Sequence, residues 1–247
     1  MDLGLEGKRA LVAASSAGLG FGTAAALAAD GVRVVINGRD PDRLAAAAER
    51  LPGSIPIAGD AGTPAGARGL VERATAELGG LDILVPNAGG PPPGNWESTA
   101  FEQYAPALEL SLLSIVAMCE AAVPDMREQG WGRVAAITSI SVRQPIPNLI
   151  LSNTARAGVT GFLKTLAGEV AGDGVTVNSV QPGTHDTDRI RTVFGDDLDA
   201  LGAGIPVGRV GDAGDFGKVV AFVCSEAASF ITGAAIPVDG GSYAALQ

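Results

Sequence analysis

The stretch K-R-A-L-V-A-A-S-S-A-G-L-G-F-G, residues 8–22, decides how this chain folds. Its apolar run, Ala10–Ala14, predicts a buried strand, and the alanine-rich segment Leu19–Asp30 predicts a helix. Gly18 and Gly20 lack a Cβ, so the backbone between these elements can come close to a bound group. The helix would direct free N–H groups and its positive dipole end toward an anion. The pattern suits a dinucleotide pyrophosphate, although small residues also form ordinary tight turns.

Strands and helices alternate along the rest of the chain, without a linker or a repeat. Asp40-Pro41 and Thr63-Pro64 are N-cap signals that mark two of the helix starts. We expect strands at 10–14, 32–37, 55–59, 81–85, 133–138, 175–181 and 234–238, and helices at 19–30, 41–51, 64–78, 101–129, 151–171 and 212–225. This alternation predicts one α/β domain over residues 1–247, with a doubly wound, seven-stranded parallel sheet. Ligands should bind at the carboxyl ends of the strands, and the polar segment 184–211 is expected to be a flexible substrate loop.

Composition narrows the class of protein. A net charge of −10 argues against nucleic acid or an anionic membrane as a partner. Cys119 and Cys224 have no metal-ligand spacing and are expected to be reduced core thiols. The N-terminus is unlike a signal peptide, and no apolar run reaches the ~18 residues that span a bilayer. We therefore expect a soluble, cytoplasmic protein.

Three sets of residues resemble motifs of the short-chain dehydrogenase/reductase family, nearest to its 3-oxoacyl-acyl-carrier-protein reductases. Residues 13–20 match Thr-Gly-x-x-x-Gly-x-Gly, residues 86–89 match Asn-Asn-Ala-Gly, and residues 177–183 with 238–241 match two late signatures. Ala14 replaces the first glycine, which is tolerable if that turn keeps a negative φ. The resemblance covers essentially the whole chain. It implies a single-domain Rossmann fold and a homodimer or homotetramer paired through the helices at 101–129 and 151–171.

The residues that the family uses in catalysis are mostly replaced. Its asparagine, serine, tyrosine and lysine correspond to Ser111, Ser139, Ser152 and Arg156, so only Ser139 keeps its type. A serine hydroxyl is far too weak to replace tyrosine as general acid, and arginine keeps a charge but does not readily release a proton. One interpretation is a polar site adapted to a new use. The other is a decayed site in which Ser139, Ser152 and Arg156 are loop and helix-cap residues.

His185, the only histidine, is a candidate replacement for the missing acid. It follows Pro182-Gly183 at the end of a predicted strand, beside the position where the family binds nicotinamide. The alternative is a solvent-exposed loop histidine. Asp186 or Thr187 is expected to cap a helix that begins near Asp188.

The resemblance also assigns cofactor-binding residues and favours NADP (NADPH). The second strand ends in Asn37-Gly38-Arg39-Asp40, where Asn37 is neutral and Arg39 can form charge-assisted bonds to a 2′-phosphate. Arg39 as a plain surface charge is the alternative. The complete set is Ala14, Ser15, Ser16, Gly18, Leu19, Gly20, Asn37, Arg39, Asp60, Ala61, Asn87, Ala88, Gly89, Pro182 and Gly183.

These observations lead to one function hypothesis and two alternatives. The first is an atypical NADP(H)-dependent oxidoreductase that acts on a carbonyl or alcohol of a small molecule. The second is an enzyme that keeps the nucleotide but performs lyase or isomerase chemistry. The third is a non-catalytic subunit that pairs with an active homologue.

Overall fold

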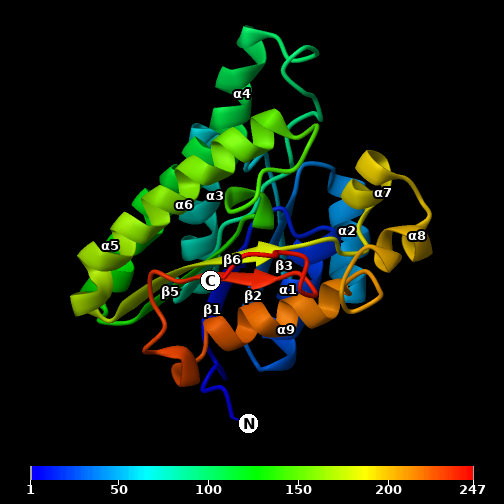
Figure 1. The fold of residues 1–247 in the computed structure, drawn as a ribbon. Coiled ribbons are helices and arrows are strands. Elements are labelled where there is room, and N and C mark those ends of the chain that lie inside the picture. The colour runs from blue at the N-terminus through cyan, green and yellow to red at the C-terminus, as the bar shows by residue number, and fades with distance from the viewer. Residues whose placement is uncertain (1, 247) are drawn as a thin grey trace.

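One parallel sheet runs through the middle of the computed structural model, which describes residues 2–246 (Figure 1). Its order is β3-β2-β1-β4-β5-β6-β7, so the direction of winding reverses between β1 and β4. This confirms the doubly wound, seven-stranded prediction and places a crevice at the carboxyl ends of these two strands. The strands are β1 (Arg9–Val12), β2 (Arg33–Gly38), β3 (Ile55–Ala58), β4 (Ile83–Val85), β5 (Gly132–Ile137), β6 (Val175–Pro182) and β7 (Ala235–Val238).

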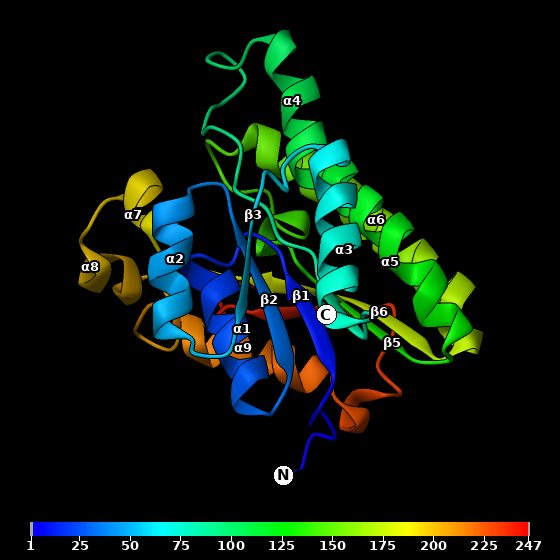
Figure 2. The same cartoon turned by 180° about the vertical axis from the view of Figure 1, so that it is seen from behind.

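Helices cover both faces of the sheet (Figures 1 and 2). One face is packed by α1 (Gly18–Ala29), α2 (Pro41–Arg50) and α9 (Ala213–Val223), and the other by α3 (Pro64–Leu78), α5 (Ser114–Glu128) and α6 (Ile150–Val170). Each layer has its own apolar core. Cys119 lies in one core and Cys224 in the other, and burial raises the pKa of each thiol to about 12. The prediction that both cysteines are core residues is therefore confirmed.

The predicted long helix at 101–129 is built from four pieces. These are a 3₁₀ turn (Phe101–Gln103), α4 (Tyr104–Leu108), a π-helical turn (Glu109–Leu113) and α5. By length and composition alone, this segment could cross a membrane, which the sequence analysis did not expect. Half of its most apolar window is buried inside the protein, where α5 packs on α3 and α6. Leu113 is 43% exposed, so part of the apolar surface of this segment faces outward in the single chain.

Segment 184–211 has regular structure of its own. It contains α7 (Asp188–Phe194) and α8 (Leu198–Ala203), and its two ends are joined by hydrogen bonds between Thr184, Asp186 and Gly211. The cap of α7 is Thr187, whose Oγ1 accepts a hydrogen bond from the Ile190 N–H at 3.3 Å. The local capping signals were sufficient to predict this helix. The expectation of a flexible substrate loop stays a prediction.

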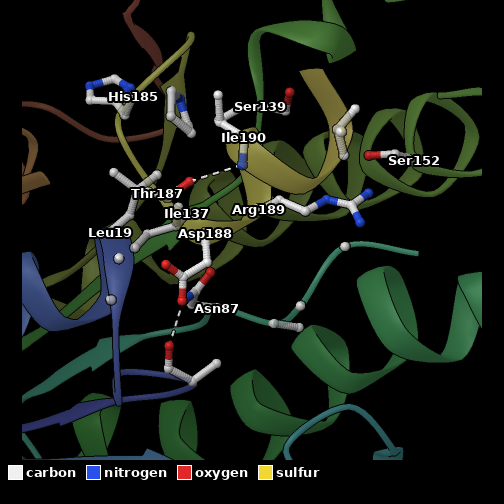
Figure 3. Close-up of a pocket in the computed structure, with 18 of the residues that line it drawn as sticks. Leu19, Asn87, Ile137, Ser139, Ser152, His185, Thr187, Asp188, Arg189 and Ile190 are labelled. Carbon is white, nitrogen blue, oxygen red and sulfur yellow. Dashed lines mark hydrogen bonds between the residues drawn. The ribbon is translucent and has the colours of Figure 1, made fainter. Parts of the chain in front are cut away.

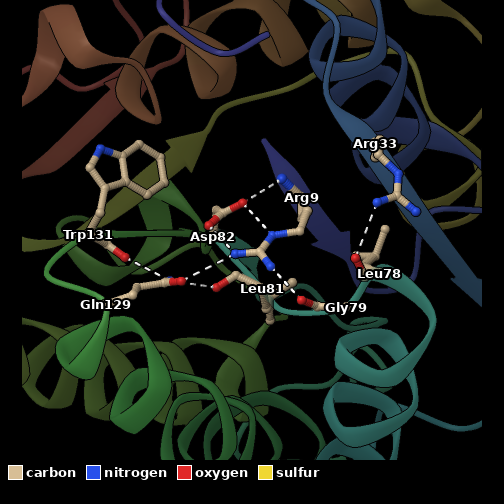
Figure 4. A network of polar contacts seen from close by, with 8 residues as sticks. All are labelled: Arg9, Arg33, Leu78, Gly79, Leu81, Asp82, Gln129 and Trp131. Carbon is tan, nitrogen blue, oxygen red and sulfur yellow. Dashed lines mark hydrogen bonds and ion pairs between the residues drawn. The ribbon is translucent and has the colours of Figure 1, made fainter. Parts of the chain in front are cut away.

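A polar network joins the amino ends of β1 and β4 (Figure 4). The guanidinium of Arg9 donates to Asp82 at 2.7 and 2.8 Å and to the Gly79 carbonyl at 2.6 Å. Gln129 accepts from the same guanidinium and donates to the carbonyls of Leu81 and Trp131. Burial alone would raise the pKa of Asp82, but the hydrogen bonds and charge of Arg9 outweigh it and hold that pKa below its usual value.

Candidate functional site

The glycine-rich turn between β1 and α1 is tight and strained. Ala14 has φ of 45°, so the expectation of a negative φ at this position is wrong. Asparagine side chains hold the turn from two sides: the Ala14 N–H donates to Asn37 Oδ1 at 3.1 Å, and Asn87 Nδ2 donates to the Ala14 carbonyl at 3.2 Å. A Cβ at Gly20 would lie 2.5 Å from that carbonyl, which explains why this position is glycine. A left-handed alanine costs about 1 kcal/mol, which these contacts offset.

The first turn of α1 lacks a capping side chain. The helices α2, α3, α7 and α9 each begin with a side chain that accepts backbone N–H bonds. The N-cap of α1, Ala17, offers none, and the first turn holds no acidic residue. The N-terminal N–H groups of α1 are therefore available to an anion, which suits a dinucleotide pyrophosphate.

A cavity of about 580 Å³ opens in front of this helix end (Figure 3). Its walls come from the turn after β1, from Asn87–Gly90 after β4, from Ile137–Ile140 after β5, from the start of α6, and from Pro182–Ile190 after β6. The cavity thus occupies the crevice where the winding of the sheet reverses, as expected for this class of fold. The predicted cofactor residues that line it are Ala14, Ser16, Gly18, Leu19, Gly20, Asn87, Ala88, Gly89, Pro182 and Gly183.

Two predicted cofactor contacts, Ser15 and Asn37, are instead parts of the scaffold. Ser15 is fully buried; its Oγ donates to the Val12 carbonyl at 2.6 Å and accepts from the Asn37 N–H at 2.9 Å. The Asn37 amide nitrogen donates to the carbonyls of Ile57 and Gly59. Both side chains therefore form hydrogen bonds that shape the turn, and a contact of these residues with the cofactor stays a prediction.

Three further predicted cofactor residues lie outside the cavity wall. Arg39 is exposed beyond the end of β2, Asp60 accepts a hydrogen bond from the Gly62 N–H at 2.9 Å, and Ala61 is buried. Sequence analysis missed Arg43, which lines the cavity from the first turn of α2 and pairs with Asp188 at the start of α7. Its position three residues after the N-cap Asp40 was a usable signal, because such a residue lies next to the end of the second strand.

The cavity also collects Ser139, Ser152 and Arg156. Ser139 caps a short 3₁₀ turn (Ile140–Val142) by accepting from the Ser141 N–H at 3.1 Å, and its hydroxyl hydrogen remains free. Ser152 and Arg156 lie one turn apart on α6, and each is 8% exposed. Arg156 donates through Nη1 to the Ile137 carbonyl at 3.1 Å. Ser139 is therefore both a cap and a wall residue, while the side chains of Ser152 and Arg156 are held in the interior.

Arg189 is a second guanidinium in this cavity that sequence analysis missed. Its Nη2 donates to the Pro91 carbonyl at 2.7 Å, and a Cβ on Gly90 would lie only 3.0 Å from the guanidinium. Burial, together with the charge of Arg189, lowers the pKa of Arg156 to about 10. Both groups remain cationic at neutral pH, so this end of the cavity is strongly electropositive.

Comparison with known proteins identifies the family. The model of the family described as "Enoyl-(Acyl carrier protein) reductase" matches residues 13–243. The 3-oxoacyl-[acyl-carrier-protein] reductase FabG of Escherichia coli is 33% identical over 242 residues, which are 98% of this chain and 99% of that protein. The chain belongs to the short-chain dehydrogenase/reductase family. The resemblance inferred from the motifs is thereby confirmed.

Other members of the short-chain family agree in sequence and in structure. Dehydrogenase/reductase SDR family member 4 of Bos taurus is 32% identical over 249 residues, covering 98% of this chain and 89% of that protein. The crystal structure of L-sorbose reductase from Gluconobacter frateurii, complexed with NADPH and L-sorbose, superposes with a TM-score of 0.92. It is 32% identical, and the match covers 100% of both chains.

Ser111, at the asparagine position of the short-chain family, does not reach the cavity. It lies in the π-helical turn, is fully buried, and its Oγ has no hydrogen-bond partner among residues 2–246. This position therefore lies outside the cavity wall, and its assignment as a catalytic residue stays a prediction.

His185 is buried, so the interpretation as an exposed loop histidine is also wrong. It is 5% exposed, its ring packs edge-on against Phe216 at 5.2 Å between centroids, and its Nδ1 lies 3.2 Å from the Gly183 carbonyl oxygen. Burial lowers the pKa of His185 and keeps the ring neutral near pH 7. Figure 3 shows the ring turned away from Ser139 and Ser152, although the residue contributes to the cavity wall. This orientation does not suit proton transfer to a group held between the two serines.

Proposed function

We propose that the protein is an NADP(H)-dependent oxidoreductase of the cytoplasm that interconverts a carbonyl and an alcohol on a small molecule. The observation that carries the proposal is the shared cavity: the uncapped start of α1 and the cluster of Ser139, Ser152 and Arg156 open into the same space. Bound nicotinamide would supply or accept the hydride there. Gly18, Leu19 and Gly20 would hold the pyrophosphate through their N–H groups.

The end of β2 supports a preference for the 2′-phosphorylated nucleotide. Arg39 and Arg43 provide two cations near this end. The nearby acid, Asp40, accepts from the N–H groups of Asp42 and Arg43 as the cap of α2. A carboxylate engaged in this way is poorly suited to bind ribose hydroxyls, whereas a phosphate could pair with both arginines. L-sorbose reductase, which was solved with NADPH, provides a precedent in the family.

The chain's own residues offer electrostatic rather than acid catalysis. A guanidinium in a desolvated site stabilises negative charge that develops on a carbonyl oxygen without giving up a proton. Arg156 is buried and cationic, and the hydroxyls of Ser139 and Ser152 can donate hydrogen bonds. Water would then supply the proton that the family's tyrosine normally provides. The price is a slower reaction, because loss of general-acid help costs ~10²–10⁴ in rate.

A nucleotide titration followed by hydride-transfer assays over a panel of ketones tests this function. We expect NADPH to bind at least about tenfold more tightly than NADH and to be consumed with one of the ketones. Equal affinities for the two nucleotides would contradict the cofactor assignment. Tight binding with turnover but no net change in cofactor redox state would favour a lyase or isomerase. Co-purification with a homologue that retains Tyr-x-x-x-Lys would favour a partner subunit.

We also propose that the protein assembles as a homodimer or homotetramer through α5 and α6. The outer side of the 101–128 segment supports this, because half of its most apolar window is left uncovered and Leu113 is 43% exposed. Two copies related by a two-fold axis would bury this surface. A monomer in light scattering at micromolar concentration would contradict the proposal.

A further inference from the structure

Two guanidiniums face the cavity without a carboxylate to neutralise them. Arg156 is 8% exposed and uses one of its five N–H donors, on the Ile137 carbonyl. Arg189 is half-buried and uses one of its donors on the Pro91 carbonyl. Among residues 2–246, neither arginine forms an ion pair.

No acid in the cavity wall is free to serve them. Asp188 is the one acidic residue among the described lining residues, and it is paired with Arg43. Removing two like charges from water is costly when no counter-charge is present. The two charges are also close enough for Arg189 to lower the pKa of Arg156. Such an arrangement is stabilised when an anion binds between the two groups.

The wall around these arginines is otherwise largely apolar. Ser152 lies beside them in the same cavity, and Figure 3 shows the Arg189 guanidinium extending toward the side on which Ser152 lies. The apolar lining residues are Ile140, Ile146, Leu149, Ile190, Val193 and Phe194. The space therefore suits a molecule with an anionic group at one end and an apolar body.

We propose that Arg156 and Arg189 bind the carboxylate of a small oxo acid, or of the corresponding hydroxy acid, whose apolar body lies against the isoleucine and leucine wall. The reacting carbonyl in this assignment rests on the proposed function, whereas the carboxylate rests on the two guanidiniums alone. Planar guanidinium groups match carboxylate oxygens in pairs. A neutral ester or thioester would leave both cations unpaired.

Calorimetric binding to the NADP⁺-loaded protein tests the proposal. The probes are 4-methyl-2-oxopentanoate, phenylpyruvate and 3-oxohexanoate, each measured beside its methyl ester. We expect at least one acid to bind about tenfold to a hundredfold more tightly than its ester, as charge-assisted bonds in a desolvated site allow. If no acid binds more tightly than its ester, the proposal is overturned.

Variants of Arg189 test whether its guanidinium causes the preference for acid over ester. R189Q should abolish most of the preference for acid over ester, and R189K should retain part of it. The matched control is R191Q, because Arg191 lies on the same helix but is paired with Asp186. R191Q should leave the preference unchanged. If R189Q fails to fold, the R189K variant and the acid–ester comparison in the native protein still decide.

The affinity for NADPH, measured on the same variants, shows whether the Arg189 guanidinium binds the cofactor or the substrate carboxylate. A large loss of NADPH affinity in R189Q, with the acid preference intact, would assign the guanidinium to the cofactor and overturn the proposal. Because binding needs no turnover, acids that bind but are never reduced would refute the proposed reductase activity alone. Neutral ketones reduced with no preference for acids would refute the carboxylate site alone.

Discussion

The arginines at the two ends of the sheet are treated in opposite ways. At the amino ends, Arg9 has a carboxylate, a carbonyl and an amide oxygen as partners (Figure 4). At the carboxyl ends, Arg156 and Arg189 each have one carbonyl and no carboxylate as a partner among residues 2–246. All three side chains are charged and at least partly buried. A carboxylate could therefore have neutralised Arg156 and Arg189, as Asp82 neutralises Arg9.

We interpret this difference as a division of roles: the groups at the amino ends of the strands stabilise the fold, and those at the carboxyl ends bind ligands. Buried polar groups in a folded protein are normally satisfied, and an exception needs an explanation. In this chain Arg9 is satisfied by groups of the protein, whereas Arg156, Arg189 and the first N–H groups of α1 keep unused donors among residues 2–246, which we propose bind the cofactor and the substrate. Substitutions at five places in the chain test this difference, and the largest expected effect comes first.

The largest effect is expected from restoring the family's acid in the open site. The double variant S152Y/R156K should raise reductase activity on neutral β-keto esters by ~10²–10⁴, because a tyrosine beside a cation is a competent general acid. The control is S152F/R156K, which adds the ring without the hydroxyl and should gain nothing. A double variant that folds and binds NADPH but reduces nothing would favour the non-redox alternatives.

Removing the Arg9–Asp82 ion pair at the amino ends of the strands should lower the stability of the fold. D82N leaves the partly buried Arg9 without its counter-charge and should lower the free energy of unfolding by about 2–3 kcal/mol. D188N is the matched control, since its pair with Arg43 is exposed, and it should cost about 0–1 kcal/mol. Equal losses in urea unfolding would remove the distinction between the two ends.

The Arg9–Asp82 pair also predicts how stability changes at acidic pH. Because the folded-state pKa of Asp82 lies below its unfolded value, its contribution to stability is present above about pH 4. It is lost as the pH falls through the folded-state pKa. D82N should therefore lose less stability than the native protein between neutral and strongly acidic pH.

Removing a cation near β2 should affect only nucleotide choice. R39A is expected to erase most of the preference for NADPH over NADH, a change of about tenfold, because one charge-assisted contact is lost. R43A should have a similar effect if the phosphate also recruits this residue from Asp188. An unchanged NADPH to NADH ratio in both variants would exclude a role for these arginines.

A change in the glycine-rich turn should relieve strain. A14G replaces a left-handed alanine with a residue that adopts φ of 45° freely. We expect a gain of about 0.5–1 kcal/mol, or roughly 1–4 °C in Tm for a chain of this size. A loss of stability would show that the Ala14 methyl makes packing contacts that outweigh the strain.

The smallest effect is expected at His185. Its folded-state pKa is lowered by burial, so the neutral ring stabilises the protein above about pH 6.5 and this contribution is lost as the pH falls through the folded-state pKa. H185N should flatten the dependence of stability on pH in this range. The pH–rate profile should keep its shape, because the ring is turned away from Ser139 and Ser152. Loss of a group titrating near pH 6–7 in that profile would restore His185 as the acid.

The sequence was a good guide wherever the deciding contacts are local. Asp40 and Thr63 cap the helices that their spacing predicted, and each predicted strand is present within a few residues of its expected limits. Both signals depend on neighbours a few positions apart. Within segment 184–211 the sequence did not predict α8 or the backbone bonds between distant residues, such as the one from Gly211 to Thr184.

The candidate site was predicted only in part. The cavity does contain Ser139, Ser152 and Arg156, because strand ends and helix starts set their positions. The side chain of Asn37 turns inward to bond Ala14, Ile57 and Gly59, and the sequence did not predict these partners. Arg189 was missed because no local pattern marks it as facing a cavity. Arg43 was missed although its place three residues after the N-cap Asp40 was a usable signal.

By itself, the sequence determined the alternation of strands and helices and the glycine-rich turn, and it predicted Ser152 and Arg156 at the positions of the family's tyrosine and lysine. These follow from residue type and spacing along the chain. Only the tertiary structure decided the sign of φ at Ala14, the inward direction of His185 and the pairing of each arginine. Whether a charge is neutralised depends on groups that lie far apart in sequence, as Arg9 and Asp82 do, and folding alone brings them together or keeps them apart.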